Sequence, residues 1–273
     1  MPVGKLTTPV RPTAVVTYRA GRARPDGAWH TPVVLWTLVL IALVVLVASY
    51  AQAVSGFGFA LIASPLLAAL QGPKAAVVGG AVVATMQSVY VMRRLRHNVH
   101  WRAVAFITGA SLFGMPLGLV VFTHLSSAGL TATIGVLVLV FAVLLWRGLQ
   151  LPDTHLTETV AGFIAGTLST STGTSGPPIV ITFHGRGLEP NAFRASLAGV
   201  FTVQGLVSVA LFAATGKFDA DVWRIIAVGT PAMIVGWLAG NRLFDRIDHD
   251  RFRKIVLWML FASGLVAIAS TIL

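Results

Sequence analysis

Long apolar runs, separated by short polar stretches, fill most of the chain after residue 31. Most of these runs approach or exceed the roughly 20 residues that a helix needs to cross a bilayer, and they are too long for strands. The ten runs lie near residues 33–54, 56–70, 75–92, 103–123, 129–147, 157–170, 173–185, 191–214, 224–243 and 252–272.

Three runs are too short to cross a bilayer as single helices. The run 157–170 is short throughout, whereas 56–70 and 173–185 are also interrupted by Gly and Pro. The pattern therefore predicts an all-α polytopic integral membrane protein, with about eight spanning helices and Gly/Pro-broken re-entrant segments. We expect it in the cell (plasma) membrane as a multi-pass protein.

The composition excludes a soluble enzyme and a disordered chain. Of 273 residues, 56% are hydrophobic and only 11% are charged, and the mean hydropathy is +0.82. Soluble domains carry about 25% charged residues. The net charge of +11 is better explained by Lys and Arg collected in cytoplasmic loops than by nucleic-acid binding. The absence of Cys excludes disulfides and thiolate metal sites.

The chain also repeats itself. At an offset of 117 residues the shared positions include two equivalent glutamines, and at an offset of 122 they include a Trp-Arg pair and a Gly-x-x-x-Gly motif. These matches are Gly56 with Gly173, Gln87 with Gln204, Trp101 with Trp223, Gly114 with Gly236 and Gly118 with Gly240. We expect the Gly-x-x-x-Gly positions to serve close helix packing. The predicted organisation is a basic N-terminal tail (1–31), a first transmembrane repeat (32–148), a linker loop (149–156) and a second repeat (157–273).

The loop charges predict that the two repeats have opposite orientations. Loop 93–102 carries four arginines, whereas its counterpart 215–224 balances Lys217 and Arg224 with two aspartates. In the next pair of loops the basic residues lie in the second half, at 242–254. Because Lys and Arg favour the cytoplasmic side, equivalent loops face opposite sides, as in the inverted repeats of secondary transporters. The same assignment of loops to the two sides places the basic N-terminal tail outside, which disagrees with the preference of Lys and Arg for the cytoplasmic side.

Polar residues concentrate where the short runs break. The first break contains Gln52, Ser55, Gly56, Phe57 and Gly58; the second contains Ser171, Thr172, Gly173, Thr174, Ser175 and Gly176. Unwound backbone at membrane depth usually lines a cavity, and helices that restart after it direct free N–H groups into that cavity. Pro177 and Pro178 suit the first turn of such a helix. The pattern predicts a central pocket for an anion or another solute with acceptor oxygens. Tight packing through small residues is the alternative.

Three further residues are candidates for this pocket. Gln87 and Gln204 lie inside apolar helices, where they either line the path or form an interhelical hydrogen bond. Arg194 lies just inside a helix near the second break and could attract an anion. Arg186 is a candidate for the same role, although both arginines also suit anchoring on the cytoplasmic side.

The acidic residues and histidines argue against other chemistry. All nine acids lie in tails, loops or helix ends, although carriers of protons or cations usually keep a buried carboxylate. The seven histidines lie at segment ends without ligand spacing, so we expect no metal, no cofactor and no catalytic residue.

Several motifs resemble the sulfite exporter TauE/SafE family. Those of the second half are Gly162–Gly166, Thr172–Pro178, Arg186–Leu188 and Phe193–Leu197; those of the first half are Ser55–Ala60 and Pro65. The resemblance covers about residues 35–270. It departs at Thr174 and Ser175, where glycine or isoleucine is more usual, and at Phe59, where glycine is common. The resemblance implies a membrane transporter, usually with eight helices, that exports sulfite or organosulfonates.

Together these observations predict a transporter that exports a small sulfur-containing anion through the central pocket. Alternating access of the two repeats, driven by the membrane potential, is the expected mechanism. The alternative is a carrier of another small organic anion or of a neutral metabolite with the same architecture. The expected partners are the anionic substrate and the lipid bilayer, without nucleic acid; homodimer formation is left open.

Overall fold

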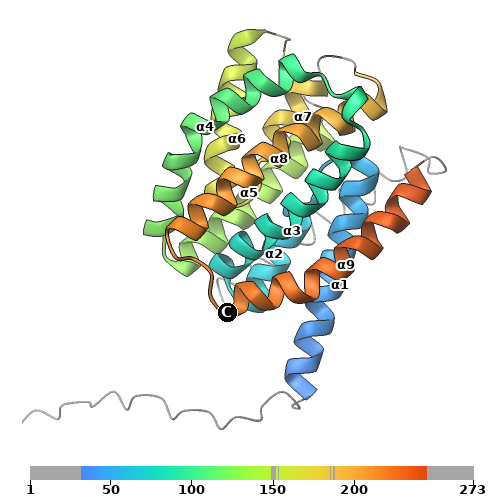
Figure 1. Ribbon diagram of the computed structural model, residues 1–273. Helices are drawn as coiled ribbons and strands as arrows, with labels where there is room; N and C mark the ends of the chain where they lie inside the picture. The colour runs from blue at the N-terminus through green and yellow to red at the C-terminus, as the bar shows by residue number, and fades with distance from the viewer. Residues whose placement is uncertain (1–31, 149–151, 153, 185, 187, 245–273) are drawn as a thin grey trace, which may run out of the picture.

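The computed structural model describes residues 32–148, 152, 154–184, 186 and 188–244. Within these residues the regular elements are helical and no strand occurs. The helices gather into one bundle, and the beginning of α1 extends beyond it (Figure 1). The α-helices are α1 (Pro32–Ser55), α2 (Phe59–Gln71), α3 (Pro73–Arg94), α4 (Trp101–His124), α5 (Ser127–Trp146), α6 (His155–Ser171), α7 (Gly176–His184), α8 (Pro190–Ala214) and α9 (Ala220–Phe244). A short 3₁₀ helix, η2 (Arg96–Asn98), precedes α4.

Six of these helices are long and apolar enough to cross a membrane: α1, α3, α4, α5, α8 and α9. Many large apolar side chains on them are exposed, among them Trp36, Phe113 and Trp223. An exposed apolar surface of this extent is expected where lipid covers the protein. The polytopic all-α architecture is confirmed, with six candidate spans in the described part of the chain. The predicted tail 1–31 and the last apolar run, 252–272, lie outside the described residues.

Both predicted breaks occur, and glycine permits each of them. The chain leaves α1 at Gly56 and enters α2 after Gly58, and both glycines have positive φ (83° and 103°). The second break, between α6 and α7, contains Gly173 with φ 73°. Glycine adopts this left-handed region without the steric cost of a Cβ. Both helices that restart are short, 13 residues in α2 and 9 in α7.

Local sequence also fixes where several helices begin. Thr154 caps α6, because its side-chain oxygen accepts a hydrogen bond from the Thr157 amide at 3.2 Å. Pro73 and Pro190 occupy the first turns of α3 and α8, where no N–H is needed for helix hydrogen bonding. Pro177 and Pro178 lie in the first turn of α7, as predicted.

The Gly-x-x-x-Gly motifs bring helices from different halves of the chain into backbone contact. A Cβ at Gly114 or Gly118 of α4 would overlap the carbonyl oxygens of Phe163 or Thr167 in α6. The same relation holds between α9 and α1, where a Cβ at Gly236 or Gly240 would overlap backbone atoms of Leu46 or Tyr50. The predicted packing role of these glycines is confirmed.

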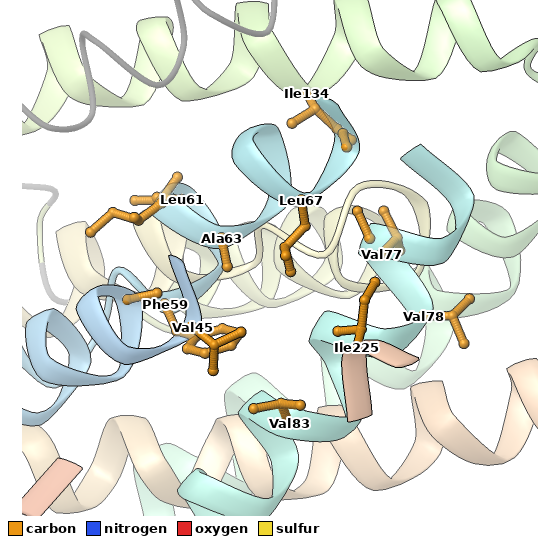
Figure 2. Close-up of a cluster of buried hydrophobic side chains, with 14 of the residues drawn as sticks. Val45, Phe59, Leu61, Ala63, Leu67, Val77, Val78, Val83, Ile134 and Ile225 are labelled. Carbon is orange, nitrogen blue, oxygen red and sulfur yellow. The ribbon is translucent and has the colours of Figure 1, made fainter. Parts of the chain in front are cut away.

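Two large apolar clusters and a small third one, among the described residues, hold the bundle together. The largest combines Val45 of α1, Phe59 and Leu67 of α2, Ile134 of α5 and Ile225 of α9 with Val77, Val78 and Val83 of α3 (Figure 2). The second cluster joins α4, α6, α7 and α8. Phe59, the first residue of α2, is 1% exposed and belongs to the largest cluster. Phe59 therefore anchors the first turn of this half-helix in the core.

Candidate functional site

A cavity of about 70 Å³ lies where the two breaks meet. Gly58 to Leu61 line it from the first break and the start of α2, and Gly173 to Gly176 line it from the second break and the start of α7. The remaining lining residues come from α1, α3, α6 and α8: Gln52, Ala81, Ala84, Thr85, Ser88, Ser169, Phe201, Gln204, Gly205 and Ser208. The cavity can hold a few water molecules or one small oxyanion.

Two helix N-termini border this cavity. The first N–H groups of a helix have no partner within that helix, and the helix dipole makes this end partly positive. In α2 the first such groups belong to Phe59, Ala60 and Leu61, and all three residues line the cavity. In α7 the first two positions after Gly176 are prolines without an N–H, so α7 contributes fewer donors than α2. Within the described residues, no charged side chain lines the cavity.

Hydroxyl and amide side chains complete the lining. Ser169 Oγ lies 3.1 Å from Ser208 Oγ, and Gln52 Nε2 donates to Ser88 Oγ at 3.4 Å. These two contacts join α6 to α8 and α1 to α3. Both consist of groups that can turn toward a solute, because a hydroxyl rotates to suit its partner. The cavity can therefore bind a small polar solute through neutral donors.

Seven of the fourteen predicted site residues line this cavity: Gln52, Gly58, Gly173, Thr174, Ser175, Gly176 and Gln204. The other seven do not line it: Ser55, Gly56, Phe57, Gln87, Ser171, Thr172 and Arg194. Several of the second group support the breaks. The Ser55 hydroxyl donates to the Ala51 carbonyl at 2.7 Å, and Thr172 Oγ1 lies 2.7 Å from Thr174 Oγ1. Gln87 donates to the Ser49 carbonyl of α1 at 3.0 Å, the interhelical bond considered for it.

Arg194 packs next to Gly56 of the first break and does not line the cavity. It is 5% exposed, and its guanidinium group donates to Asn241 Oδ1 at 3.4 Å and stacks 4.0 Å from the Phe244 ring centroid. A Cβ on Gly56 would lie 3.0 Å from Arg194 Cγ. Arg194 therefore connects α8 with α9 and with the turn between α1 and α2.

Some lining residues were not predicted from the sequence. Ser88 follows Gln87 directly, and Ser208 lies four residues after Gln204, one helical turn away on the same face. Thr85 and Ser169 also belong to this group, together with the aromatic residues Phe59 and Phe201. The helical spacing of Ser208 from Gln204 could have indicated that Ser208 lines the same cavity. No sequence feature marked Phe201, because aromatic residues are common in apolar helices.

A second, larger cavity of about 730 Å³ lies at one end of the bundle. Its lining includes Arg102, His155, Glu158 and Arg186. Glu158, in the first turn of α6, is only 1% exposed; its carboxylate pairs with Arg186 and lies 3.4 Å from His155 Nδ1. The sequence did not predict a buried carboxylate, because Glu158 stands at a helix end where exposure is usual.

Comparison with known proteins identifies similar chains. The sequence model of a family described as sulfite exporter TauE/SafE matches residues 41–267. A protein of Cupriavidus necator, named probable sulfite/organosulfonate exporter TauE, is 29% identical over 227 residues, covering 79% of this chain and 88% of the relative. A protein of Comamonas testosteroni, named probable inner membrane transporter protein TsaS, is 26% identical over 177 residues, covering 62% of this chain and 72% of the relative. No solved structure matches the chain.

Proposed function

The chain belongs to the sulfite exporter TauE/SafE family, and from that membership we propose that it exports a small sulfur-containing anion, sulfite or an organosulfonate. The family consists of membrane transporters rather than enzymes, and the chain is a multi-pass protein of the cell membrane. The proposal places the substrate in the cavity between the two breaks.

The observation that carries this proposal is the meeting of two half-helix N-termini at one cavity. The starts of α2 and α7 both line it, and no charged side chain among the described residues does so. Backbone N–H groups and helix dipoles stabilise an anion without a fixed counter-charge. An ion held in this way can leave again, because the site does not bind it with the strength of a buried Arg or Lys. That property suits a carrier.

The proposed mechanism is alternating access of two inverted repeats around this cavity. It is supported by equivalent contacts in the two halves. Gly114 approaches the carbonyl of Phe163 as Gly236 approaches that of Leu46, and these partners are related by the offsets that align the repeats. Each crossing joins one half to the other, since α4 contacts α6 and α9 contacts α1. Because each crossing connects the two halves, we expect a rotation of one half relative to the other to move both breaks.

The proposed direction is from the end of the bundle that carries the larger cavity to the opposite end. His100, Arg102, His155 and Arg186 line that larger cavity, so basic side chains from the starts of α4 and α6 and from the segment after α7 gather around it. Basic loops favour the cytoplasm, and basic side chains at a wide opening raise the local anion concentration. The membrane potential favours exit of an anion by about 2.3 kcal/mol per charge per 100 mV, so export needs no coupling ion.

Solute flux from proteoliposomes tests the proposal. Vesicles are loaded in turn with sulfite, sulfate, taurine and a carboxylate such as acetate, and a potential is imposed. We expect selective, potential-driven sulfite or sulfonate efflux, which Ser175→Ala reduces because Ser175 lines the cavity. The matched control is Thr202→Val in α8, since Thr202 is buried but bonds the Ala198 carbonyl of its own helix.

Each outcome of this flux experiment has a defined meaning. Flux of acetate or of a neutral metabolite, without flux of any sulfur oxyanion, would support a carrier of this architecture but would contradict the proposed substrate. Sulfite efflux that does not respond to the imposed potential would contradict the proposed driving force. Equal loss of efflux in Ser175→Ala and Thr202→Val would contradict the proposed site.

A further inference from the structure

The cavity between the two breaks is lined largely by equivalent positions of the two halves. Among the described residues, five pairs of lining residues are separated by the repeat offset of 117: Gln52 and Ser169, Gly58 and Ser175, Phe59 and Gly176, Ala84 and Phe201, and Ser88 and Gly205. The two members of each pair come from different halves of the chain. The halves therefore contribute matching surfaces, as expected where a solute binds between two repeats.

This equivalence ends along α3 and α8, which lie side by side (Figure 1). Ala81 is the first residue of α3 in the lining, and Ser208 is the last residue of α8. The positions equivalent to them at the same offset are Ala198 and Val91, and neither lines the cavity. Relative to a symmetric arrangement, the cavity is therefore displaced by about one helical turn along both helices.

The displacement is away from the end of the bundle that carries the larger cavity. The amide of His100, which lines the larger cavity, donates to Ser196 Oγ at 3.0 Å, so α8 begins at that end. The lining on α3 stops at Ser88, before the helix ends at Arg94 close to His100 in the sequence. The lining on α8 starts only at Phe201. The cavity thus extends toward the opposite end of the bundle.

A small apolar cluster occupies the two equivalent positions that the cavity does not reach. Val91 and Ala198 pack there with Ala53 of α1 and Trp237 of α9, and none of the four is more than 8% exposed. Along α3 and along α8 this small cluster lies about one turn beyond the last lining residue. A constriction formed by apolar side chains excludes water and ions.

We propose, building on the alternating access proposed above, that the path of the solute runs between Val91 and Ala198, and that the small cluster closes this path in the state described here. When one half rotates against the other, each takes the conformation that its counterpart has now. The cavity then extends past Val91 and Ala198, while Ala81 and Ser208 no longer line it. The path opens at one end at a time, which prevents the anion from leaking through.

Engineered cysteines test this path, because the chain contains no Cys and each new thiol is unique. Right-side-out and inside-out membrane vesicles that contain full-length Ala81→Cys or Ala198→Cys are treated with a charged, membrane-impermeant thiol reagent, with and without sulfite. We expect Ala81→Cys to react from the outside and Ala198→Cys only from the cytoplasmic side. Because a minor state is typically populated to about 0.1–10%, Ala198→Cys should react about 10- to 1,000-fold more slowly.

The matched control is Ala195→Cys, one helical turn before Ala198 on α8. Ala195 is buried in the cluster that joins α4, α6, α7 and α8, so its thiol should react from neither side. Trp237→Ala removes the largest side chain of the small cluster and should raise the rate of Ala198→Cys without changing that of Ala195→Cys. If Ala198→Cys does not fold, Val91→Cys replaces it, because the same sidedness is expected.

Reaction of Ala198→Cys from neither side, or from the same side as Ala81→Cys, would overturn this inference. Equal rates for Ala195→Cys and Ala198→Cys would overturn it as well, since the thiol would then be reached by a general opening of the bundle. Reaction from opposite sides with the two sides exchanged would support the path and contradict the proposed direction. Failure of the export proposal looks different: the unmodified protein would carry no sulfur oxyanion, whereas thiol accessibility without sulfite does not depend on the substrate.

Discussion

Replacing Gly114 by Ala tests the close crossing between α4 and α6. The new methyl group would overlap the Phe163 carbonyl oxygen and would lie 2.9 Å from the Thr167 amide nitrogen. Both are backbone atoms of α6, so no side-chain rotation relieves the overlap. The two helices must separate, and the bond from Thr167 Oγ1 to the Gly114 carbonyl, now 3.2 Å, is weakened.

The expected loss of stability follows from these two effects. Overpacking a tight contact costs about 1–3 kcal/mol, and losing a hydrogen bond costs about 1 kcal/mol. The higher helix propensity of alanine offsets about 0.8–1.0 kcal/mol of this cost. We therefore expect Gly114→Ala to destabilise the protein by about 1–3 kcal/mol, which corresponds to a melting temperature about 2–12 °C lower for a chain of this size. Gly236→Ala should behave similarly, because its methyl group would meet the Leu46 carbonyl of α1.

The matched control is Gly109→Ala in the same helix. A Cβ at Gly109 meets no atom within 4 Å, and replacing a helical glycine by alanine stabilises a helix by about 0.8–1.0 kcal/mol. This variant should therefore melt a few degrees higher. The measurement is tryptophan fluorescence during heating of the purified protein in detergent. Equal melting temperatures for Gly114→Ala and Gly109→Ala would refute the reasoning, since the crossing would then tolerate a methyl group.

Two further predictions concern the breaks and the buried ion pair. Gly173→Ala should cost about 1–2 kcal/mol, the penalty of a left-handed backbone alone, because its Cβ has room; Gly56→Ala should cost more, because its Cβ would lie 3.0 Å from Arg194 Cγ. Equal losses of melting temperature would contradict this difference. Arg186→Gln should cost about 3–5 kcal/mol, because the buried Glu158 carboxylate loses the guanidinium group and keeps only His155 nearby. The double variant with Glu158→Gln should recover most of that loss in the same thermal assay, and a double variant no more stable than Arg186→Gln alone would contradict the pairing.

The candidate site could be predicted from the sequence only in part. The two breaks were visible, because glycine with hydroxylic neighbours interrupts an otherwise apolar pattern at Gly173 and at Gly56. Gln204 was visible as an amide inside an apolar helix, but so was Gln87, and the two have different surroundings. Gln87 donates to the Ser49 carbonyl, whereas Gln204 donates to Ser111 and lines the cavity. A side chain's identity does not reveal which neighbour it faces when that neighbour is far away in the sequence.

The sequence by itself determined that the protein lies in a membrane, where its helices lie along the chain and where they break. Those features depend on local composition: apolar length sets a span, and glycine and proline set an interruption. Only the tertiary structure decided that Arg194 lies behind a break, that Glu158 is buried against Arg186, and that Ser111 orients Gln204. The physical reason is that each of these contacts joins residues far apart in the sequence, from different elements of the bundle. Such pairs are selected by how the whole bundle packs, not by any pattern along one helix.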